Sequence, residues 1–535
     1  MTHIPFPTSL SPRELLELLL GRQEVALLDV REARAYVAGH LGLSRMAPLS
    51  TLELEVRALV PRRTTLVILI DGGDADGPSA GAARLLGRMG YRNVRILEHG
   101  IEGWSAAGLP LIDGYGSLVK AFGDLVRQRY GTPTLRGEAV RERLASGQAL
   151  ALVDARPEGE YAFLSVQGAG NHAGTELALR DWSAAAAPGV PWVVNCFSRT
   201  RGIIGATTLQ VLGHPDVYFL EDGVMQWALD GAPVVQNAQA AVDLAAASDE
   251  ELARRAAGLI ERFGLPVLDE RRVRSLSEEP DWTLYVFDLR PGANGKAKAP
   301  AGARAVPGGQ LLMHFENLVG TRNARVVLLD DPHCLRAAVT AFWLTQLDQA
   351  EVFICRGPWP DTALTGDVDD PPVEPDVGLP AAQLASLLGA SPSGILVVDV
   401  GPSIDFERGH LPAAHFLLPW TFEPLRAPVE AGQRIVFCSP DGRAARLAAR
   451  AAREHWPDSG VTWLDGGTQR WEEAGYPLEQ AWEPSQLLTP FDDDWGSVMR
   501  VSAARRDRAW AQYLDWERGI SARITADPTV RFRLF

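Results

Sequence analysis

Short apolar runs alternate with amphipathic segments along most of this chain. Residues 25–28, 66–70, 150–153 and 192–194 are continuous apolar runs, and apolar residues at helical spacing follow most of them. Runs this short are typical of strands buried on both faces of a parallel sheet, and the spacing between them is typical of helices that cover such a sheet. The pattern therefore predicts an α/β fold with mainly parallel sheets flanked by helices.

The order of these elements repeats four times, so we expect four tandem units and a C-terminal helical tail. Each unit has a strand ending in aspartate and, 39 to 43 residues later, the head of a loop that precedes a helix. The strand-end residues are Asp29, Asp154, Asp288 and Asp399, and the loop-head candidates are Asp71, Cys196, Asp330 or Asp331, and Cys438. The predicted units span residues 1–113, 125–238, 262–360 and 376–482, and the tail spans 483–535.

The segments between the units differ in kind. Residues 115–130 and 244–263 have helical periodicity and are predicted to be connecting helices. Residues 361–378 are acidic and contain prolines, which is typical of a linker. In the tail, residues 500–520 form a charged helix with several aromatic residues, and we expect it to pack back on a domain.

Composition narrows the partners and the compartment. The chain has 52 basic and 67 acidic side chains, and the resulting net charge of −15 argues against a nucleic-acid or anionic-membrane partner. Its 4 cysteines make neither a disulfide framework nor a metal-binding cluster, so no metal or other cofactor is expected. The sequence shows no signal peptide and no apolar run of membrane-spanning length, so a cytoplasmic location is expected.

The second unit has the most reactive-looking loop, residues 196–202, between an apolar strand and a helix. Amides at a helix N-terminus and the helix dipole favour a negative charge, so they should lower the pKa of the Cys196 thiol. Arg199 and Arg201 add forked donors suited to an anionic substrate. The alternative is a small apolar cysteine at a strand end with two solvated arginines.

Several motifs resemble the rhodanese family. In the first unit these are residues 29–31, Tyr36 and the Gly39-His40 pair, and the fourth unit has the matching Asp399, Phe406, Gly409-His410 and Pro419. The loops at 196–201 and 438–443 are similar to the family's six-residue active-site loop, and the closing Gly-to-Trp pattern also fits. The chain most resembles bacterial four-unit rhodanese-like sulfurtransferases.

The resemblance implies a thiosulfate sulfurtransferase. Cys196 would take the outer sulfur of thiosulfate or a related persulfide donor, hold it as a persulfide, and pass it to a thiol or cyanide acceptor. Cys438 is a second candidate nucleophile with a weaker local field, because Asp441 lies beside Arg443. The predicted substrate-binding residues are Ser198, Arg199, Thr200, Arg201, Gly202, Gly442, Arg443 and Glu176, the last because an acidic group could bind an acceptor amine.

Other prominent residues have structural interpretations. A carboxylate cannot form a persulfide, so the first and third units, with aspartate at the loop head, are predicted to be inactive. The histidines of the Gly-His turns should bond backbone, the strand-end aspartates should fix the following turn, and the closing tryptophans should be packing anchors. Cys355, which follows a strand, is expected in the core.

Two other functions compete with the sulfurtransferase. A cysteine-dependent phosphatase needs a loop one residue longer, with arginine six positions after the cysteine, whereas here the separation is 5 in both cysteine loops. A sulfur-carrier or binding scaffold would use the inactive units to dock partners. We expect the two cysteine loops to act as independent sites, with Cys196 dominant.

Overall fold

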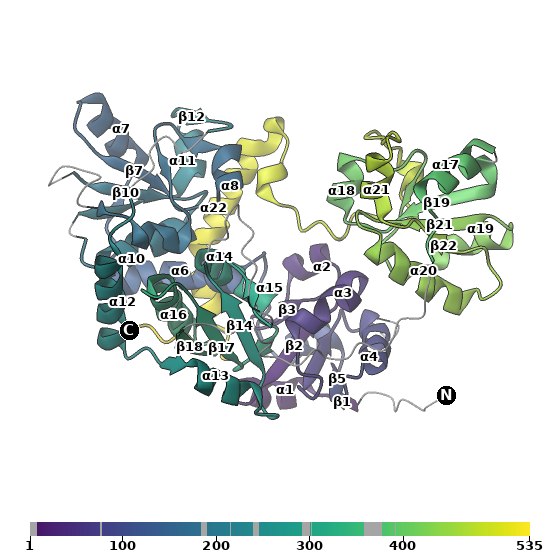
Figure 1. Ribbon diagram of the computed structural model, residues 1–535, viewed down its shortest axis with the longest axis horizontal. Helices are drawn as coiled ribbons and strands as arrows, with labels where there is room; N and C mark the ends of the chain where they lie inside the picture. The colour runs from purple at the N-terminus through teal and green to yellow at the C-terminus, as the bar shows by residue number, and fades with distance from the viewer. Residues whose placement is uncertain are drawn as a thin grey trace.

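The computed structural model describes residues 8–74, 77–182, 190–214, 216–238, 245–290, 300, 302–357, 377–390 and 392–535. Four mainly parallel sheets follow one another along the chain, and helices flank each of them (Figure 1). We call the segments that build these sheets units 1 to 4. The predicted α/β fold of four tandem units is confirmed, whereas most of the predicted linker at 361–378 lies outside the described residues.

Unit 1 forms a sheet that unit 3 extends. A short strand of unit 3, β16 (Thr321–Arg322), pairs antiparallel with the start of β2. The strands of unit 1 are β1 (Thr8–Leu10), β2 (Val25–Asp29), β3 (Arg45–Met46), β4 (Val67–Ile70) and β5 (Val94–Leu97). The helices are α1 (Pro12–Leu20), α2 (Ala33–Ala38), α3 (Leu49–Leu59), α4 (Pro78–Arg88) and α5 (Gly100–Ala106).

Unit 2 follows the connecting helix α6 (Ser117–Tyr130), which confirms the predicted helix there. Its strands are β6 (Thr134–Leu135), β7 (Ala151–Asp154), β9 (Gly170–Asn171), β10 (Trp192–Asn195) and β11 (Val217–Leu220), with the small antiparallel pair β8 (Ser165–Val166) and β12 (Val234–Val235). Its helices are α7 (Gly137–Ala145), α8 (Glu158–Phe163), the 3-10 helix η1 (Gly174–Leu179), α10 (Thr200–Val211) and α11 (Gly223–Leu229).

Unit 3 follows the second predicted connecting helix, α12 (Asp249–Phe263). Its strands are β13 (Val267–Asp269), β14 (Leu284–Asp288), β15 (Arg304–Ala305), β17 (Arg325–Leu329) and β18 (Glu351–Arg356). Its helices are α13 (Glu270–Ser277), α14 (Gly308–Met313), α15 (Phe315–Leu318) and α16 (Leu335–Leu347). Nearly every residue of α16 is buried, because units 2 and 3 pack against it from two sides.

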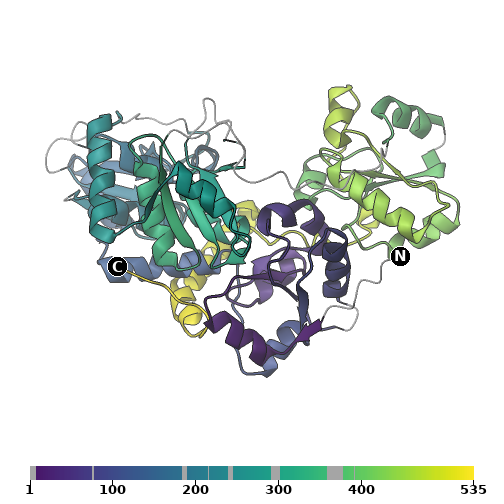
Figure 2. The same cartoon turned by 60° about the horizontal axis from the view of Figure 1, so that its bottom comes forward.

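Unit 4 has the strands β19 (Ile395–Asp399), β20 (His415–Phe416), β21 (Arg434–Cys438) and β22 (Thr462–Trp463). Its helices are α17 (Ala381–Ala390), α18 (Ser403–Arg408), α19 (Arg426–Glu430), α20 (Arg443–His455) and α21 (Gly467–Glu473), with the 3-10 turns η3 (Pro392–Gly394) and η4 (Glu423–Leu425). Unit 4 stands to one side of the molecule, next to unit 1 (Figures 1 and 2). The Arg450–Glu53 ion pair joins these two units.

The four sheets share one strand order. In unit 1 the order is β1-β5-β4-β2-β3, and units 2 and 3 repeat it as β6-β11-β10-β7-β9 and β13-β18-β17-β14-β15. Unit 4 repeats it as β22-β21-β19-β20, with Leu379 bridging to Leu464 in place of a first strand. Each loop head therefore follows the central strand, at the sheet edge where parallel α/β folds place their sites.

Side-chain bonds to the backbone also repeat from unit to unit. Each strand-end aspartate accepts a hydrogen bond from the amide two residues later, with distances of 2.8 to 3.2 Å. The Gly-His turn histidines, His40 and His410, bond the carbonyl oxygens of Tyr36 and Phe406. The buried closing tryptophans each donate Nε1–H to a proline carbonyl six residues later. These bonds confirm the predicted structural roles of all three residue types.

The C-terminal tail runs back over α6 and unit 2. It comprises the 3-10 turns η5 (Pro484–Gln486) and η6 (Val498–Arg500) and the long helix α22 (Ala503–Thr525). In Figure 1 the yellow α22 crosses behind α14 to lie along unit 2 and α6. The prediction that the tail helix packs on a domain is confirmed. Within the described residues, no helix combines the length and apolar character needed to span a membrane.

Candidate active site

The backbone of units 2 and 4 assigns their loop heads. In every unit the last residue of the central strand lies directly opposite the strand-end aspartate. In unit 2 this last residue is Asn195, so Cys196 is the first loop residue. In unit 4 it is Cys438, which lies opposite Asp399, so Ser439 is the first loop residue. The prediction that Cys438 heads its loop is wrong, because the strand runs one residue further than the spacing suggested.

Bonds within the loops confirm this assignment. The carbonyl oxygen of the loop head accepts the amide of Val224 in unit 2 and of Thr468 in unit 4. These two oxygens belong to Cys196 and Ser439, at 2.9 and 3.0 Å from the donor nitrogens. By the same contacts Asp71 heads the loop of unit 1. In unit 3 the register places Asp330 there, one residue before the alternative Asp331.

All four loop-head side chains face the start of the next helix. Cys196 receives the amide of Gly202, and Ser439 Oγ receives the amide of Ala445 at 3.2 Å. The carboxylates of units 1 and 3 bond the corresponding amides of Ser79 and Ala337, at 3.2 and 3.0 Å. A thiolate at this position would therefore be stabilised by a backbone amide of the helix's first turn. Of the four side chains, only that of Cys196 can form a persulfide.

The Cys196 loop, residues 196–201, is tightly anchored. Gly223 has a φ of +59°, and a Cβ there would stand 2.3 Å from the Cys196 carbonyl oxygen, so only glycine fits. A Cβ at Gly202 would stand 2.8 Å from the Phe219 ring, so a side chain there would displace that ring. Of the predicted substrate-binding residues here, Thr200 is buried and Ser198 is half-buried. The loop is therefore a rigid cradle around the sulfur.

The pKa of the Cys196 thiol is raised, contrary to the predicted lowering. Burial raises its pKa to about 11, while Arg201 and the Gly202 amide lower it by less. The side chain is 2% exposed, so removing the thiolate from water outweighs the loop's positive field. The helix dipole and the loop amides lower the pKa, but the cost of desolvating the thiolate is larger.

Both loop arginines are engaged by carboxylates. Arg199 is buried and forms ion pairs of 2.7 Å with Asp124 of α6 and Asp222 before α11. Arg201 forms a bidentate pair with Glu160 of α8, at 2.7 and 2.6 Å. The two ion pairs give Arg199 a structural role, and its predicted contact with the donor stays a prediction. Arg201 keeps the strongest electrostatic effect of any group on Cys196 apart from burial.

Glu176, predicted as an acceptor-binding group, is engaged by an arginine of unit 3, and its acceptor role stays a prediction. Its carboxylate pairs with Arg336 of unit 3, at 2.5 and 3.1 Å. The same face of η1 meets unit 3 so closely that Gly174 and Gly309 would clash if either had a Cβ, which would approach the other's Cα to 2.7 Å. Glu176 therefore fastens unit 2 to unit 3.

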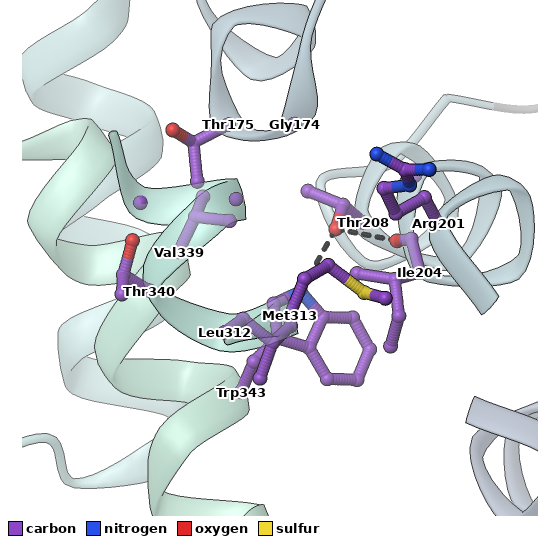
Figure 3. Close-up of a pocket in the computed structure, with 13 residues that line it drawn as sticks. Gly174, Thr175, Arg201, Ile204, Thr208, Leu312, Met313, Val339, Thr340 and Trp343 are labelled. Carbon is purple, nitrogen blue, oxygen red and sulfur yellow. Dashed lines mark hydrogen bonds between the residues drawn. The ribbon is translucent and has the colours of Figure 1, made fainter. Parts of the chain in front are cut away.

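Behind the loop, a small cavity separates units 2 and 3 (Figure 3). Arg201 lies at its rim, and Trp343 donates Nε1–H to Thr208 Oγ1 across it at 2.9 Å. Its volume of about 30 Å³ gives room for about two water molecules. It is a packing space and too small for a sulfur donor.

The groups around Cys438 differ from those around Cys196. Cys438 is fully buried among apolar side chains, and burial together with Asp399 raises its pKa well above the usual value. In the loop that follows, Gly442 adopts a φ of +82° next to Gly466 and Gly467. Arg443 is exposed and pairs with Asp441 at 3.0 Å. Cys355 is also buried, as predicted, and its pKa is raised to about 12 by burial.

Three residues near the Cys196 loop come from other segments and were not predicted from the sequence. Tyr513 and Glu517 of α22 face Ser198, whose hydroxyl lowers the pKa of both. Lys120 of α6 lies under the Tyr513 ring, with Nζ 5.5 Å from its centroid. The aromatic and acidic residues of the tail occur at helical spacing, and this pattern indicates a helix face that packs against another part of the protein. It was the one signal in the sequence that pointed to these residues.

Comparison with known proteins agrees with this architecture. The rhodanese-like domain model matches residues 11–107, 137–230 and 380–474, which lie in units 1, 2 and 4. Unit 3 has the same strand order although that model does not match it. The crystal structure of thiosulfate sulfurtransferase from Pseudomonas aeruginosa superposes with a TM-score of 0.89 and 32% identity, covering 98% of this chain and 99% of that one.

Curated relatives match over single units. A Synechococcus elongatus protein named "Putative thiosulfate sulfurtransferase" is 30% identical over 115 residues, which is 18% of this chain and 36% of that protein. The uncharacterized protein YibN of Escherichia coli is 26% identical over 97 residues, or 66% of its length. The chain thus spans about a third and about two thirds of these relatives. Because the family model matches more than half of its residues, the chain belongs to the family of proteins with rhodanese-like domains.

Proposed function

We propose that this protein is a sulfurtransferase in which Cys196 takes up a sulfane sulfur as a persulfide and passes it to an acceptor. The observation that supports this best is the position of Cys196 at the head of a six-residue loop, bonded to the Gly202 amide. The similarity to the thiosulfate sulfurtransferase of Pseudomonas aeruginosa, which covers 98% of this chain, supports the same reaction class.

The proposed sulfur transfer needs no external oxidant, because the sulfur that is transferred is already at the required oxidation level. The Cys196 thiol loses its proton to solvent, and the thiolate attacks the outer sulfur of thiosulfate or of a related persulfide donor. The donor's S–S bond breaks, sulfite or a thiolate leaves, and a new S–S bond forms on Cys196. A thiolate or cyanide then attacks the outer sulfur, and Cys196 leaves as a thiolate.

Residues of unit 2 have separate roles in this proposal. The amides that follow Cys196 cradle the partly anionic outer sulfur, as preorganised donors do at other anionic centres. Arg201 supplies the positive field, since it acts on Cys196 more strongly than any other charged group. Units 1 and 3, with Asp71 and Asp330 at their loop heads, are structural, and so is unit 4, with Ser439.

The test is a thiosulfate:cyanide assay on the purified chain, with mass spectrometry of the enzyme after a thiosulfate pulse. We expect thiocyanate to form and one sulfur atom to be added per chain, on the peptide that contains Cys196. A binding scaffold would give neither product. A cysteine-dependent phosphatase would instead hydrolyse an aryl phosphate, which the six-residue loop disfavours.

A further inference from the structure

The helix α22 covers the mouth of the Cys196 loop. Its Trp510 ring meets the Phe197 ring edge-on, with centroids 5.4 Å apart. Thr200 Oγ1 donates to Glu517 Oε1 at 3.3 Å, and Arg518 pairs with Asp222 at 2.6 Å. These contacts place side chains from the end of the chain within the electrostatic reach of Cys196, which responds to the charge of Glu517.

Glu517 is a buried carboxylic acid whose hydrogen bonding is incomplete. Glu517 is only 2% exposed. Thr200 donates to Oε1 and the Ser198 hydroxyl also bonds the carboxyl group, but among the described residues no hydrogen bond of ordinary geometry reaches Oε2 and no cation forms an ion pair with Glu517. Buried carboxylate oxygens are normally satisfied, because an unpaired one costs free energy. Oε2 therefore has room for one further donor beside these two hydroxyls.

Lys120, the cation with the largest effect on Glu517, makes contacts with other groups. Lys120 donates to the Tyr115 carbonyl oxygen, and its Nζ lies 5.0 Å from the Trp516 ring centroid. It influences Glu517 through space without forming an ion pair of its own with that carboxylate. Lys120 also acts on a second carboxylate, that of Glu316 in α15, which is half-buried.

The charged groups around the loop bear on which acceptor suits the loaded enzyme. Arg199 is paired with two carboxylates and Arg201 with one, so neither guanidinium is left without a counter-ion. An acceptor with an added anionic group would therefore find no unpaired arginine to bind that group. A ligand that carries an ammonium group beside its sulfur would instead bring the donor that Glu517 lacks.

We propose that the acceptor at the Cys196 site is an ammonium-bearing thiol, whose ammonium group binds Glu517 while its sulfur attacks the Cys196 persulfide. This inference rests on the proposed function and adds the substrate class. The acceptor thiolate forms a bond to the outer sulfur, the Cys196 S–S bond breaks, and Cys196 keeps the electron pair as a thiolate. The proton of the acceptor thiol goes to solvent, and the product is the persulfide of the aminothiol.

The test isolates the acceptor step. The enzyme is loaded with thiosulfate, freed of donor, and mixed with cysteamine, 2-mercaptoethanol or 3-mercaptopropionate, which carry an ammonium, a hydroxyl and a carboxylate group. Loss of the added sulfur is followed by mass spectrometry, with rates corrected to the thiolate concentration of each acceptor. We expect cysteamine to react about tenfold faster than 2-mercaptoethanol, the size of one charge-assisted hydrogen bond, and 3-mercaptopropionate to be slowest.

Two variants separate binding from folding. Glu517→Gln keeps the shape and the bond to Thr200, and should reduce the cysteamine preference to near unity. Asp507→Asn removes an exposed carboxylate of the same helix and should keep the wild-type preference. Melting temperatures show whether α22 stays in place in each variant. If Glu517→Gln does not fold, the comparison of the three acceptors on the wild type tests the proposal by itself.

The outcomes are distinct. Loaded wild-type enzyme that reacts equally with all three thiols, or Glu517→Gln that folds and keeps the full preference, would overturn this inference alone. An enzyme that takes up no sulfur from any persulfide donor or from thiosulfate would overturn the sulfurtransferase proposal, and the inference with it.

Discussion

Cys438 lies directly opposite Asp399 in the parallel register of β19 and β21, and so occupies the position that Asn195, not Cys196, holds in unit 2. The side chains of consecutive strand residues point to opposite faces of a sheet. A shift of one residue therefore moves a cysteine from the loop cradle into the core. This shift leaves Cys196 as the one cysteine at a loop head among the described residues.

We expect Cys196→Ser to lose thiosulfate-dependent turnover by at least about three orders of magnitude, because a hydroxyl cannot hold a transferable sulfur. Thiocyanate formation measures this loss, and the melting temperature should stay near that of the wild type. Wild-type turnover in this variant would refute the role of Cys196.

We expect Cys438→Ala to transfer sulfur at close to the wild-type rate. The side chain is fully buried among apolar neighbours, so the substitution should cost stability, about 1 kcal/mol in denaturant unfolding. After a thiosulfate pulse, the peptide with residue 438 should carry no added sulfur in the wild type. Sulfur on that peptide in the Cys196→Ser variant would restore the independent second site predicted from the sequence.

We expect Ser439→Cys, made in the Cys196→Ser background, to take up sulfur from thiosulfate. Ser439 heads a loop of the same length, and its Oγ already accepts the Ala445 amide at 3.2 Å. Loading should be slower than at Cys196, because Ala444 stands where unit 2 has Arg201. Peptide mass spectrometry measures the uptake. If the peptide with the substituted residue 439 gains no sulfur in this variant, the assignment of the loop head is contradicted.

We expect the two loop arginines to have different roles, Arg201 in the use of thiosulfate and Arg199 in the stability of the fold. Arg201→Ala should weaken thiosulfate use by about 1.5–3 kcal/mol in kcat/KM, since Arg201 is the cation that most affects Cys196. Arg199→Ala should instead destabilise the fold by about 3–5 kcal/mol, because it leaves Asp124 and Asp222 without their buried partner. Kinetics and denaturant unfolding on both variants check this division, which the reverse pattern would overturn.

We expect the buried thiol to make stability fall in alkaline solution. The pKa of Cys196 is raised to about 11 in the folded protein, whereas an unfolded cysteine titrates near about 8.5. Between these values the folded state keeps a proton that the unfolded state has lost, so this stabilisation is complete below the unfolded pKa and is lost as pH rises towards 11. Unfolding at about pH 8 and about pH 10 should show wild type losing about 1–2 kcal/mol more than Cys196→Ser. Equal losses would show that the thiol is not buried as described.

The repeat of strands and loops was visible in the sequence, because strands buried on both faces must be short and apolar and because one unit recurs four times. The strand-end aspartates, the closing tryptophans and the Cys196 loop could be located for the same reason, since each occupies a fixed place in a locally determined turn or helix start. Local spacing was enough for these features.

Which groups surround the sulfur depends on the tertiary structure and could not be predicted from the sequence. The partners of Arg199 come from α6 and from the turn before α11, the partner of Glu176 comes from unit 3, and Glu517 comes from the far end of the chain. Contacts between residues so distant in sequence depend on how whole units pack, and pattern and propensity do not encode this. Burial likewise arises from the assembled fold, which is why the pKa of Cys196 is high where the isolated loop predicted it low.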